Sequence, residues 1–254
     1  MLSELPSPMI FAHRGASAYA PENTLAAFEL ALRQGADGIE LDAKLSADGQ
    51  VMVIHDQIVD RTTPHTGRVR DFTAAELRQM DAGSHFDIAF SGEPIPTLDE
   101  VLKAVGQLTI TNIELTNYSS PTDDLPEKAA ALVRHHKLSR RVLFSSFNPV
   151  ALVRIHSLIP EAPLGLQALP GWRGALPRSW LGCLLHYQSL NPAFNDVTPG
   201  LVKSVHKRGC KVFTYTVNRE EDMRRIFMAG ADGIFTDDPV LAQQVLKTTK
   251  KQLS

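Results

Sequence analysis

Three short apolar runs near the amino terminus each deliver ionisable residues where the run ends, and this arrangement constrains the fold most strongly. The first run is followed by His13-Arg14, the second contains Glu40 and Asp42, and the third ends at His55. In a β-strand, residues i and i+2 share a face, so Glu40 and Asp42 point the same way. If this strand belongs to a parallel sheet covered on both faces, neither carboxylate is a solvated surface group. Two buried carboxylates side by side need a cation between them.

Apolar strands alternate with amphipathic helices along the whole chain, which predicts an α/β protein with parallel strands. Helical stripes at i, i+3, i+4 and i+7 separate most of the strands, as in residues 98–105. We expect strands at Met9–Ala12, Gly38–Asp42, Val51–His55, Thr109–Leu115, Val142–Phe147, Leu164–Leu169, Cys183–Ser189, Lys211–Val217 and Gly233–Thr236. That count exceeds by one what an eight-stranded barrel can use.

The segment Ala47-Asp48-Gly49-Gln50 accounts for the surplus strand. Asp-Gly between two apolar alternations is a strong hairpin signal, so the third strand runs back and brings His55 close to Asp42. Eight strands remain, which predicts a (β/α)₈ TIM barrel with a small insertion after the second barrel strand. We expect residues 45–96 to form the hairpin and the inserted region, within one domain that spans residues 1–254. An open doubly wound sheet is the alternative.

Composition and charge favour a soluble enzyme over a nucleic-acid or membrane protein. The chain has 254 residues, 43% hydrophobic and 21% charged, and its net charge of −2 indicates no attraction to polyanions. No apolar run approaches the roughly 20 residues of a membrane helix, and the first eight residues lack a signal-peptide pattern. We therefore expect a cytoplasmic location. The cysteines, Cys183 and Cys210, are few and far apart, which predicts buried free thiols.

The predicted carboxyl ends of the strands hold three acidic residues. Barrel enzymes place their working residues at these ends, and here they are Glu40, Asp42 and Glu114. Three carboxylates form a hard oxygen site for Mg²⁺ or Ca²⁺, between which the sequence does not choose. Zinc is disfavoured, because no histidine pair or cysteine lies at ligand spacing with them. The expected cofactor is therefore a divalent cation.

Two histidines and an arginine are expected around that cation. His13 and His55 offer a general acid and a general base, and Arg14 offers a planar fork for a phosphate or a carboxylate. Together with a hard cation, these groups suit hydrolysis of a phosphodiester. Each has a structural alternative: a lone histidine can be a satisfied structural residue, and Arg14 could pair with the Glu40 and Asp42 carboxylates in place of a metal. Their conjunction at successive strand ends favours catalysis.

The chain resembles the glycerophosphodiester phosphodiesterase family. The matching motifs occur in the same order as in the family, from about residue 9 to 240. The matching segments are His13-Arg14-Gly15, Pro21-Glu22-Asn23-Thr24, Ala27-Phe28, Gly35-Ala36-Asp37, Ile39-Glu40-Leu41-Asp42, Asp48-Gly49, His55-Asp56, Arg61-Thr62-Thr63, Ile95-Pro96-Thr97-Leu98, Asn112-Ile113-Glu114-Leu115, Phe144-Ser145-Ser146-Phe147, Thr216-Val217-Asn218 and Gly233-Ile234-Phe235-Thr236-Asp237.

The resemblance implies an eight-fold barrel with a small insertion and hydrolysis of glycerophosphodiesters to glycerol 3-phosphate and an alcohol. It implies the following roles: His13 and His55 as the acid–base pair, Glu40, Asp42 and Glu114 as metal ligands, and Arg14 on the phosphate. The strand-end aromatics Phe147 and Tyr215 are expected to line the substrate pocket. Whether the nucleophile is water or the substrate's own glycerol hydroxyl is open.

The chain departs from the family pattern at two positions. The family usually has a lysine two residues after the third metal carboxylate, as a further phosphate contact, and here that position is Thr116. Losing a charge-assisted contact typically costs about 1.5–3 kcal/mol, unless another cation compensates. The aromatic before the Thr-Val-Asn run is usually tryptophan and here is Tyr215, which keeps an apolar face and adds a hydroxyl.

Two other functions compete with the leading one. A lipid-directed phosphodiesterase of lysophospholipase D or phospholipase C type would want exposed apolar residues near the barrel mouth, and the inserted region offers only Phe72, Phe86, Ile88 and Phe90. A barrel that binds phosphate-containing ligands without turnover is the other alternative.

The expected partner is a small-molecule glycerophosphodiester, with no nucleic acid and no membrane span, and the sequence does not indicate the oligomeric state. His186 is a weak candidate for substrate contact.

Overall fold

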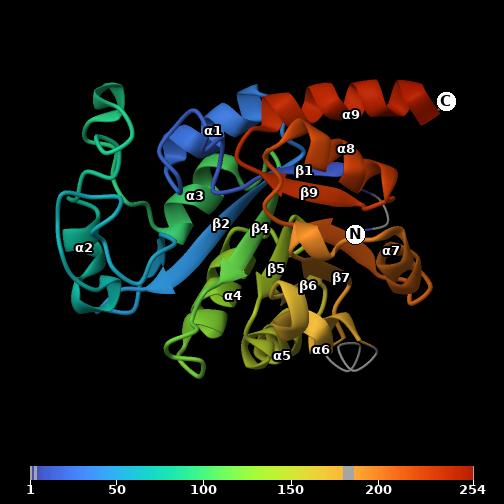
Figure 1. Cartoon of the computed structure of the whole chain (residues 1–254). Helices are drawn as coiled ribbons and strands as arrows, with labels where there is room; N and C mark the ends of the chain where they lie inside the picture. The colour runs from blue at the N-terminus through green and yellow to red at the C-terminus, as the bar shows by residue number, and fades with distance from the viewer. Residues whose placement is uncertain (1, 3–4, 180–185, 254) are drawn as a thin grey trace.

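The computed structural model describes residues 2, 5–179 and 186–253, and its parallel strands close into a barrel (Figure 1). The barrel strands are β1 (Met9–Ala12), β2 (Gly38–Leu45), β4 (Ile110–Leu115), β5 (Val142–Ser146), β6 (Leu164–Ala168), β7 (Ser189–Pro192), β8 (Lys211–Thr214) and β9 (Gly233–Thr236). Their order is β1-β9-β8-β7-β6-β5-β4-β2, and pairing of β1 with β2 closes the ring. The TIM barrel is therefore confirmed over the doubly wound sheet.

Helices follow most of the barrel strands, and several of them begin at a residue whose side chain caps the helix. They are α1 (Leu25–Arg33), α2 (Ala74–Leu77), α3 (Leu98–Val105), α4 (Leu125–His135), α5 (Pro149–Leu158), α6 (Ala175–Arg178), α7 (Pro199–His206), α8 (Glu220–Met228) and α9 (Pro239–Leu253). The hydroxyl of Thr24 accepts a hydrogen bond from the Ala27 backbone and starts α1. Thr97 and Glu100 form a reciprocal capping box that starts α3. No helix of the described part of the chain is long and apolar enough to cross a membrane.

The hairpin after β2 leaves the barrel and begins the inserted region. β3 (Val51–Val53) runs antiparallel to the end of β2, with Ala43 opposite Val53. The three-residue 3₁₀ turns Val69–Asp71 and Ile88–Phe90 and the helix α2 follow, to one side of the barrel (Figure 1). This region has a small apolar core of its own, made of Met52, Ile54, Val59, Val69, Ala74, Leu77, Met80, Ala82 and Ile95.

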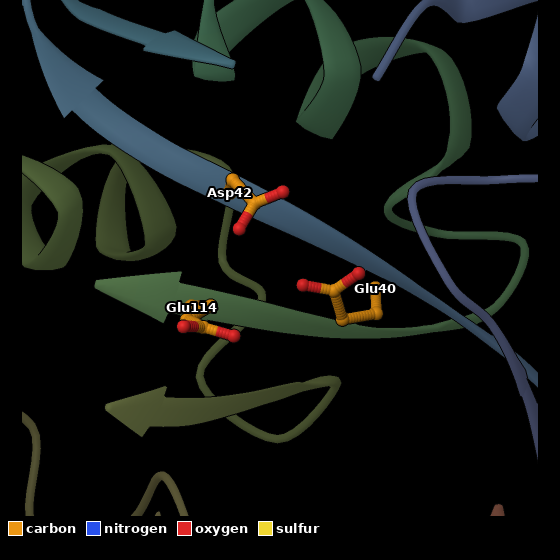
Figure 2. A group of neighbouring side chains, drawn as sticks. All are labelled: Glu40, Asp42 and Glu114. Atoms are coloured by element: carbon orange, nitrogen blue, oxygen red, sulfur yellow. The ribbon is translucent and has the colours of Figure 1, made fainter. Parts of the chain in front are cut away.

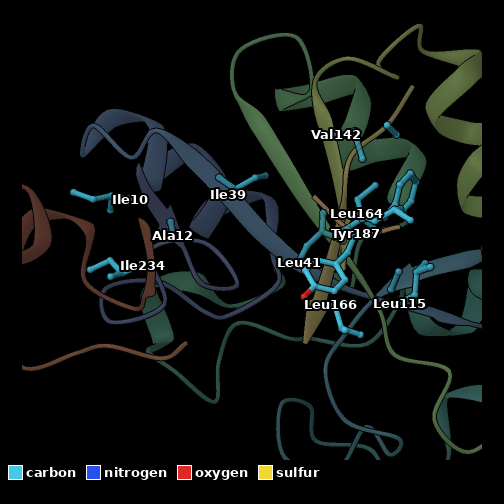
Figure 3. Close-up of a cluster of buried hydrophobic side chains, with 14 of the residues drawn as sticks. Ile10, Ala12, Ile39, Leu41, Leu115, Val142, Leu164, Leu166, Tyr187 and Ile234 are labelled. Carbon is cyan, nitrogen blue, oxygen red and sulfur yellow. The ribbon is translucent and has the colours of Figure 1, made fainter. Parts of the chain in front are cut away.

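Alternation along the strands divides the main core into two layers. Ile10, Ile39 and Leu41 belong to the large cluster in which strands and helices pack together, and Figure 3 shows them among its buried side chains. The opposite face of β1 carries Phe11, which packs in a second cluster against the rings of Phe213 and Phe235, at centroid distances of 5.3 and 5.0 Å. Because this cluster joins residues of several strands, it forms an apolar floor inside the barrel. Polar residues can then gather above it.

One predicted strand is wrong in its position. The expected strand Cys183–Ser189 is replaced by β7, which starts at Ser189 and ends at Pro192, while residues 186–188 are not in a strand and 183–185 lie outside the described residues. The prediction rested on the apolar residues that precede Ser189 in the sequence. The strand ends at Pro192, which has no backbone N–H to donate, but its carbonyl oxygen accepts from the Tyr215 backbone at 3.3 Å.

His186 therefore does not lie at the barrel mouth, and the prediction that it contacts substrate is wrong. It precedes β7, at the amino ends of the strands, where its ring stacks on that of His156 at 5.7 Å. Cys210 is half-buried and Cys183 lies outside the described residues, so the thiol prediction stays a prediction.

Candidate active site

Three carboxylates meet above the apolar floor of the barrel. Glu40 and Asp42 come from one face of β2, and strand register places Asp42 opposite Glu114 on β4 (Figure 2). One oxygen from each residue lies within 4.8 Å of the others. Glu40 and Asp42 are 2% and 1% exposed, so water cannot solvate these charges. The pairing predicted from i, i+2 alternation is thus present, with the third carboxylate beside it.

The electrostatics of this cluster fit a hard divalent cation. Burial, together with the charges of Asp42 and Glu114, raises the pKa of Glu40 well above its usual value. Burial and the charge of Asp42 raise the pKa of Glu114 to about 7. Glu40 Oε1 is buried and has no hydrogen-bond partner within the described part of the chain. Carboxylates that repel one another at close range, one of them with a buried oxygen that has no donor, form an arrangement that Mg²⁺ or Ca²⁺ stabilises.

Arg14 is held beside the carboxylates by an uncommon backbone conformation. Its φ angle is 56°, in the left-handed region, and its backbone N–H donates to Glu40 Oε2 at 2.9 Å. The following Gly15 has φ 86°, and a Cβ there would lie 2.6 Å from Ala27. The guanidinium contacts Glu22 Oε1 at 3.0 Å and lies 3.2 Å from Asp42 Oδ2. Such backbone strain concentrates at functional sites, and here the conformation directs the Arg14 guanidinium toward the carboxylates.

His13 forms a half-buried pair with an aspartate that lies far along the chain. Its Nδ1 lies 2.7 Å from Asp237 Oδ1, across 224 residues of sequence. Ser17 and Asn218 also donate to Asp237. Burial alone would raise the pKa of Asp237, but these hydrogen bonds and the histidine lower it. With Nδ1 bound to a carboxylate, the ring exchanges protons through Nε2.

His55 forms a second pair, with the adjacent residue. Its Nδ1 lies 2.7 Å from Asp56 Oδ1, and Asp56 Oδ2 accepts from Arg61 Nε at 2.6 Å. Arg61 then binds both oxygens of Glu22, at 2.6 and 2.7 Å, and Glu22 binds Arg14. An alternating chain of charges therefore joins His55 to Arg14.

All of the residues predicted for the site line one pocket of about 150 Å³. They are His13, Arg14, Glu40, Asp42, His55, Glu114, Phe147 and Tyr215. The rings of Phe147 and Tyr215 are nearly perpendicular at a centroid distance of 5.8 Å, and the Tyr215 hydroxyl donates to the Ala168 carbonyl at 2.8 Å. The pocket thus has an aromatic wall on one side and charged groups on the other.

Sequence reasoning assigned no role to several residues that the pocket needs. Asn112 and Gln167 line it, and Gln167 donates to Glu114. The Tyr118 hydroxyl also donates to Glu114, and burial together with that carboxylate raises the pKa of Tyr118. Asp237 stood in a matching segment, but its partnership with His13 depends on barrel closure. Tyr118 gave no signal, because it lies on an irregular loop beyond β4.

The threonine that replaces the expected lysine has a lysine beside it. Lys44 follows Asp42 on the same face of β2 and is 6% exposed. Its ammonium donates to Thr116 Oγ1 at 2.5 Å. Burial lowers the pKa of Lys44, and the charges of Asp42 and Glu114 oppose this effect. A positive side chain therefore remains next to position 116, supplied by the neighbouring strand.

Comparison with known proteins identifies the family of this chain. Residues 13–241 match the model of the glycerophosphoryl diester phosphodiesterase family. A glycerophosphodiester phosphodiesterase of Caldanaerobacter subterraneus is 41% identical over 233 residues, which cover 91% of this chain and 94% of that protein.

Solved structures give the same result. A phosphodiesterase of Oleispira antarctica, in complex with the product sn-glycerol-3-phosphate, has a TM-score of 0.87 at 32% identity, covering 95% of this chain and 97% of the other. A glycerophosphodiester phosphodiesterase of Agrobacterium tumefaciens has a TM-score of 0.80 at 35% identity, covering 93% and 99%. The chain therefore belongs to the glycerophosphoryl diester phosphodiesterase family and is an enzyme of that kind.

Proposed function

We propose that the enzyme hydrolyses glycerophosphodiesters such as glycerophosphoethanolamine or glycerophosphocholine to glycerol 3-phosphate and the free alcohol. The observation that carries this proposal is the shared pocket, in which two histidine–aspartate pairs and Arg14 surround three carboxylates, two of them buried and the third half-buried. These are the groups that cleavage of a phosphodiester requires. The named relatives and the product in the related structure support the same reaction.

Each residue has a chemical task in this proposal. Arg14 binds the phosphoryl oxygens through its planar guanidinium. One histidine accepts at Nε2 the proton of the attacking water or glycerol hydroxyl, whose oxygen forms a new bond to phosphorus as the P–O bond to the alcohol breaks, and the other histidine protonates the departing oxygen. If the glycerol hydroxyl attacks, water then opens the cyclic phosphate with the same two histidines, which gives glycerol 3-phosphate. Asp237 and Asp56 hold the rings and stabilise their charged forms. Glu40, Asp42 and Glu114 would hold a divalent cation, which offsets the developing negative charge on the phosphoryl oxygens when bound.

Lys44 is proposed to supply the positive charge that the chain lacks at Thr116. Its ammonium bonds to Thr116 and lies within electrostatic range of Asp42 and Glu114. Lys44→Met should raise KM for the diester a few-fold, because Lys44 lines a neighbouring pocket and its positive charge acts on the site at a distance. Thr116→Lys on that background should recover most of the loss. An unchanged KM in Lys44→Met would exclude this role.

The reaction is tested by measuring glycerol 3-phosphate released from glycerophosphoethanolamine after EDTA treatment, with Mg²⁺, Ca²⁺ or Mn²⁺ added back. His13→Ala and Glu114→Gln should abolish the release that the metal restores. His136→Ala is a matched control, because His136 is 2.7 Å from Asp99 in a histidine–aspartate pair that does not line the pocket. Failure of every metal to restore release in the wild type would exclude the proposed hydrolysis.

One observation favours a second candidate, a lipid-directed phosphodiesterase. The segment after β6 exposes Trp172, Leu176 and Leu169 by 83%, 62% and 44% at the carboxyl ends of the strands. Exposed tryptophan and leucine near a mouth are typical of contact with acyl chains or a lipid interface. Trp172→Ser should leave turnover of glycerophosphocholine unchanged. If the wild type prefers lysophosphatidylcholine and only this preference falls in Trp172→Ser, the second candidate replaces the first.

A further inference from the structure

Asn112 lies deep in the pocket with its acceptor oxygen unused. It is fully buried, lines the pocket and stands directly opposite Glu40 in the register between β2 and β4. Its amide nitrogen donates to Ser145 Oγ at 2.9 Å. Its Oδ1 has no hydrogen-bond partner within the described residues, and the same is true of Glu40 Oε1 on the facing strand. Buried polar atoms in folded proteins are nearly always paired, so two unpaired oxygens facing one cavity require an explanation.

In the structure, the nitrogen end of the Asn112 amide faces Ser145 and the oxygen end faces the other way. Ser145 Oγ accepts from Asn112 and lies 3.5 Å from Gln167 Nε2, while Gln167 also donates to Glu114. The donor half of Asn112 is therefore turned toward Ser145 on β5, and its carbonyl oxygen points away from it. An asparagine carbonyl is a good ligand for Ca²⁺ and Mg²⁺ and carries no charge.

We infer that Asn112 Oδ1 is a fourth protein oxygen for the cation held by Glu40, Asp42 and Glu114. The inference rests on the cation site of the proposed function but not on turnover. A neutral ligand adds coordination without adding repulsion to three crowded carboxylates. Since Ca²⁺ takes six to eight oxygens and Mg²⁺ retains more water, a fourth protein oxygen should benefit Ca²⁺ more.

Calorimetric titration of the metal-free enzyme, without substrate, tests this role. Asn112→Leu keeps the branched shape of the side chain and removes the oxygen, so the Kd for Ca²⁺ should rise about tenfold or more and that for Mg²⁺ should rise less. Asn112→Asp restores an oxygen and adds charge, so both cations should bind at least as tightly as in the wild type. Asn191→Leu is the control, because Asn191 is a buried asparagine on β7 that does not line the pocket.

The outcomes separate this inference from the proposed reaction. Equal affinities in wild type and Asn112→Leu would overturn the fourth ligand even if turnover continues. Weaker binding in both Asn112→Leu and Asn112→Asp would also overturn it, since the nitrogen and not the oxygen would then be needed. If the metal affinities follow the expected order but the enzyme hydrolyses no diester, Asn112 stays a metal ligand and the proposed function is wrong. Circular dichroism of each variant checks that it folds.

Discussion

His13 and Asp237 follow β1 and β9, two hydrogen-bonded neighbours in the closed barrel, whereas His55 and Asp56 follow β3 on the hairpin outside it. Both pairs have the same 2.7 Å contact at Nδ1, but their supports differ. The barrel pair is positioned by backbone hydrogen bonds, including His13 N to Thr236 O at 2.8 Å. The hairpin pair is positioned by side-chain ion pairs through Arg61 and Glu22.

This difference suggests a rigid support for one histidine of the proposed acid–base pair, His13, and an adjustable support for the other, His55. Backbone pairing within a closed sheet fixes a side chain in space. Exposed ion pairs contribute little each, and salt screens them. The His55 side chain is 41% exposed, against 19% for His13. We therefore expect damage to the barrel pair to affect the chemical step, and damage to the hairpin pair to affect how well the pocket assembles.

The largest effect is expected for Asp237→Asn. The amide cannot stabilise a charged His13, so kcat should fall about 100-fold or more with KM little changed. Glycerol 3-phosphate release at saturating substrate measures this. Asp238→Asn is the control, because Asp238 is the next residue and binds Tyr19 and the start of α9 instead. A loss below threefold would contradict the importance given to the barrel pair.

Asp56→Asn should have a smaller effect, about tenfold on kcat/KM, because Arg61 and Glu22 still hold the segment in place. The ratio of kcat/KM in Asp56→Asn to kcat/KM in Asp237→Asn measures the difference between the two histidine–aspartate pairs. If Asp56→Asn proves the more damaging, the adjustable side carries the harder proton transfer, and the comparison reverses.

Arg61 and Glu22 should act as one unit. Arg61→Gln and Glu22→Gln should each lower kcat/KM a few-fold. The double variant should be less impaired than the product of the two, with a coupling energy of about 1 kcal/mol. Arg70→Gln serves as an exposed control in the same inserted region. Additive effects would show that the charge chain does not transmit support to His55.

The smallest effect concerns stability and pH in the metal-free enzyme. The pKa of Glu114 is about 7 in the folded state and 4.5 at its usual value, because burial and Asp42 disfavour its charge. The folded state then holds its proton more tightly, so the associated stability is present at low pH and is lost as pH rises toward and past 7. The Tm should fall between pH 5 and 8 in EDTA, with a shallower fall in Glu114→Gln. If the difference in Tm between wild type and Glu114→Gln does not change with pH, the raised pKa of Glu114 is contradicted.

Local patterns in the sequence predict much of this architecture. Alternation assigns Glu40 and Asp42 to one face, and the Asp48-Gly49 turn places His55 near them without knowledge of the fold. Residues supplied by irregular backbone or distant strands could not be found this way. Tyr118 lies on a loop, Lys44 gains its meaning only from the position of Thr116, and Asn112 depends on register with Glu40. The position of β7 could not be predicted from apolar content, because the residues before Ser189 are more apolar than the strand itself, which has the sequence Ser-Leu-Asn-Pro.

Closure of the barrel between its first and last strands has a consequence for how the enzyme is made. His13 leaves the ribosome early, but its carboxylate partner is added 224 residues later. A nascent chain that ends before β9 cannot close the ring, and one that ends before Asp237 lacks the carboxylate that contacts His13. The proposed acid–base site therefore cannot form until the chain has been synthesised through residue 237.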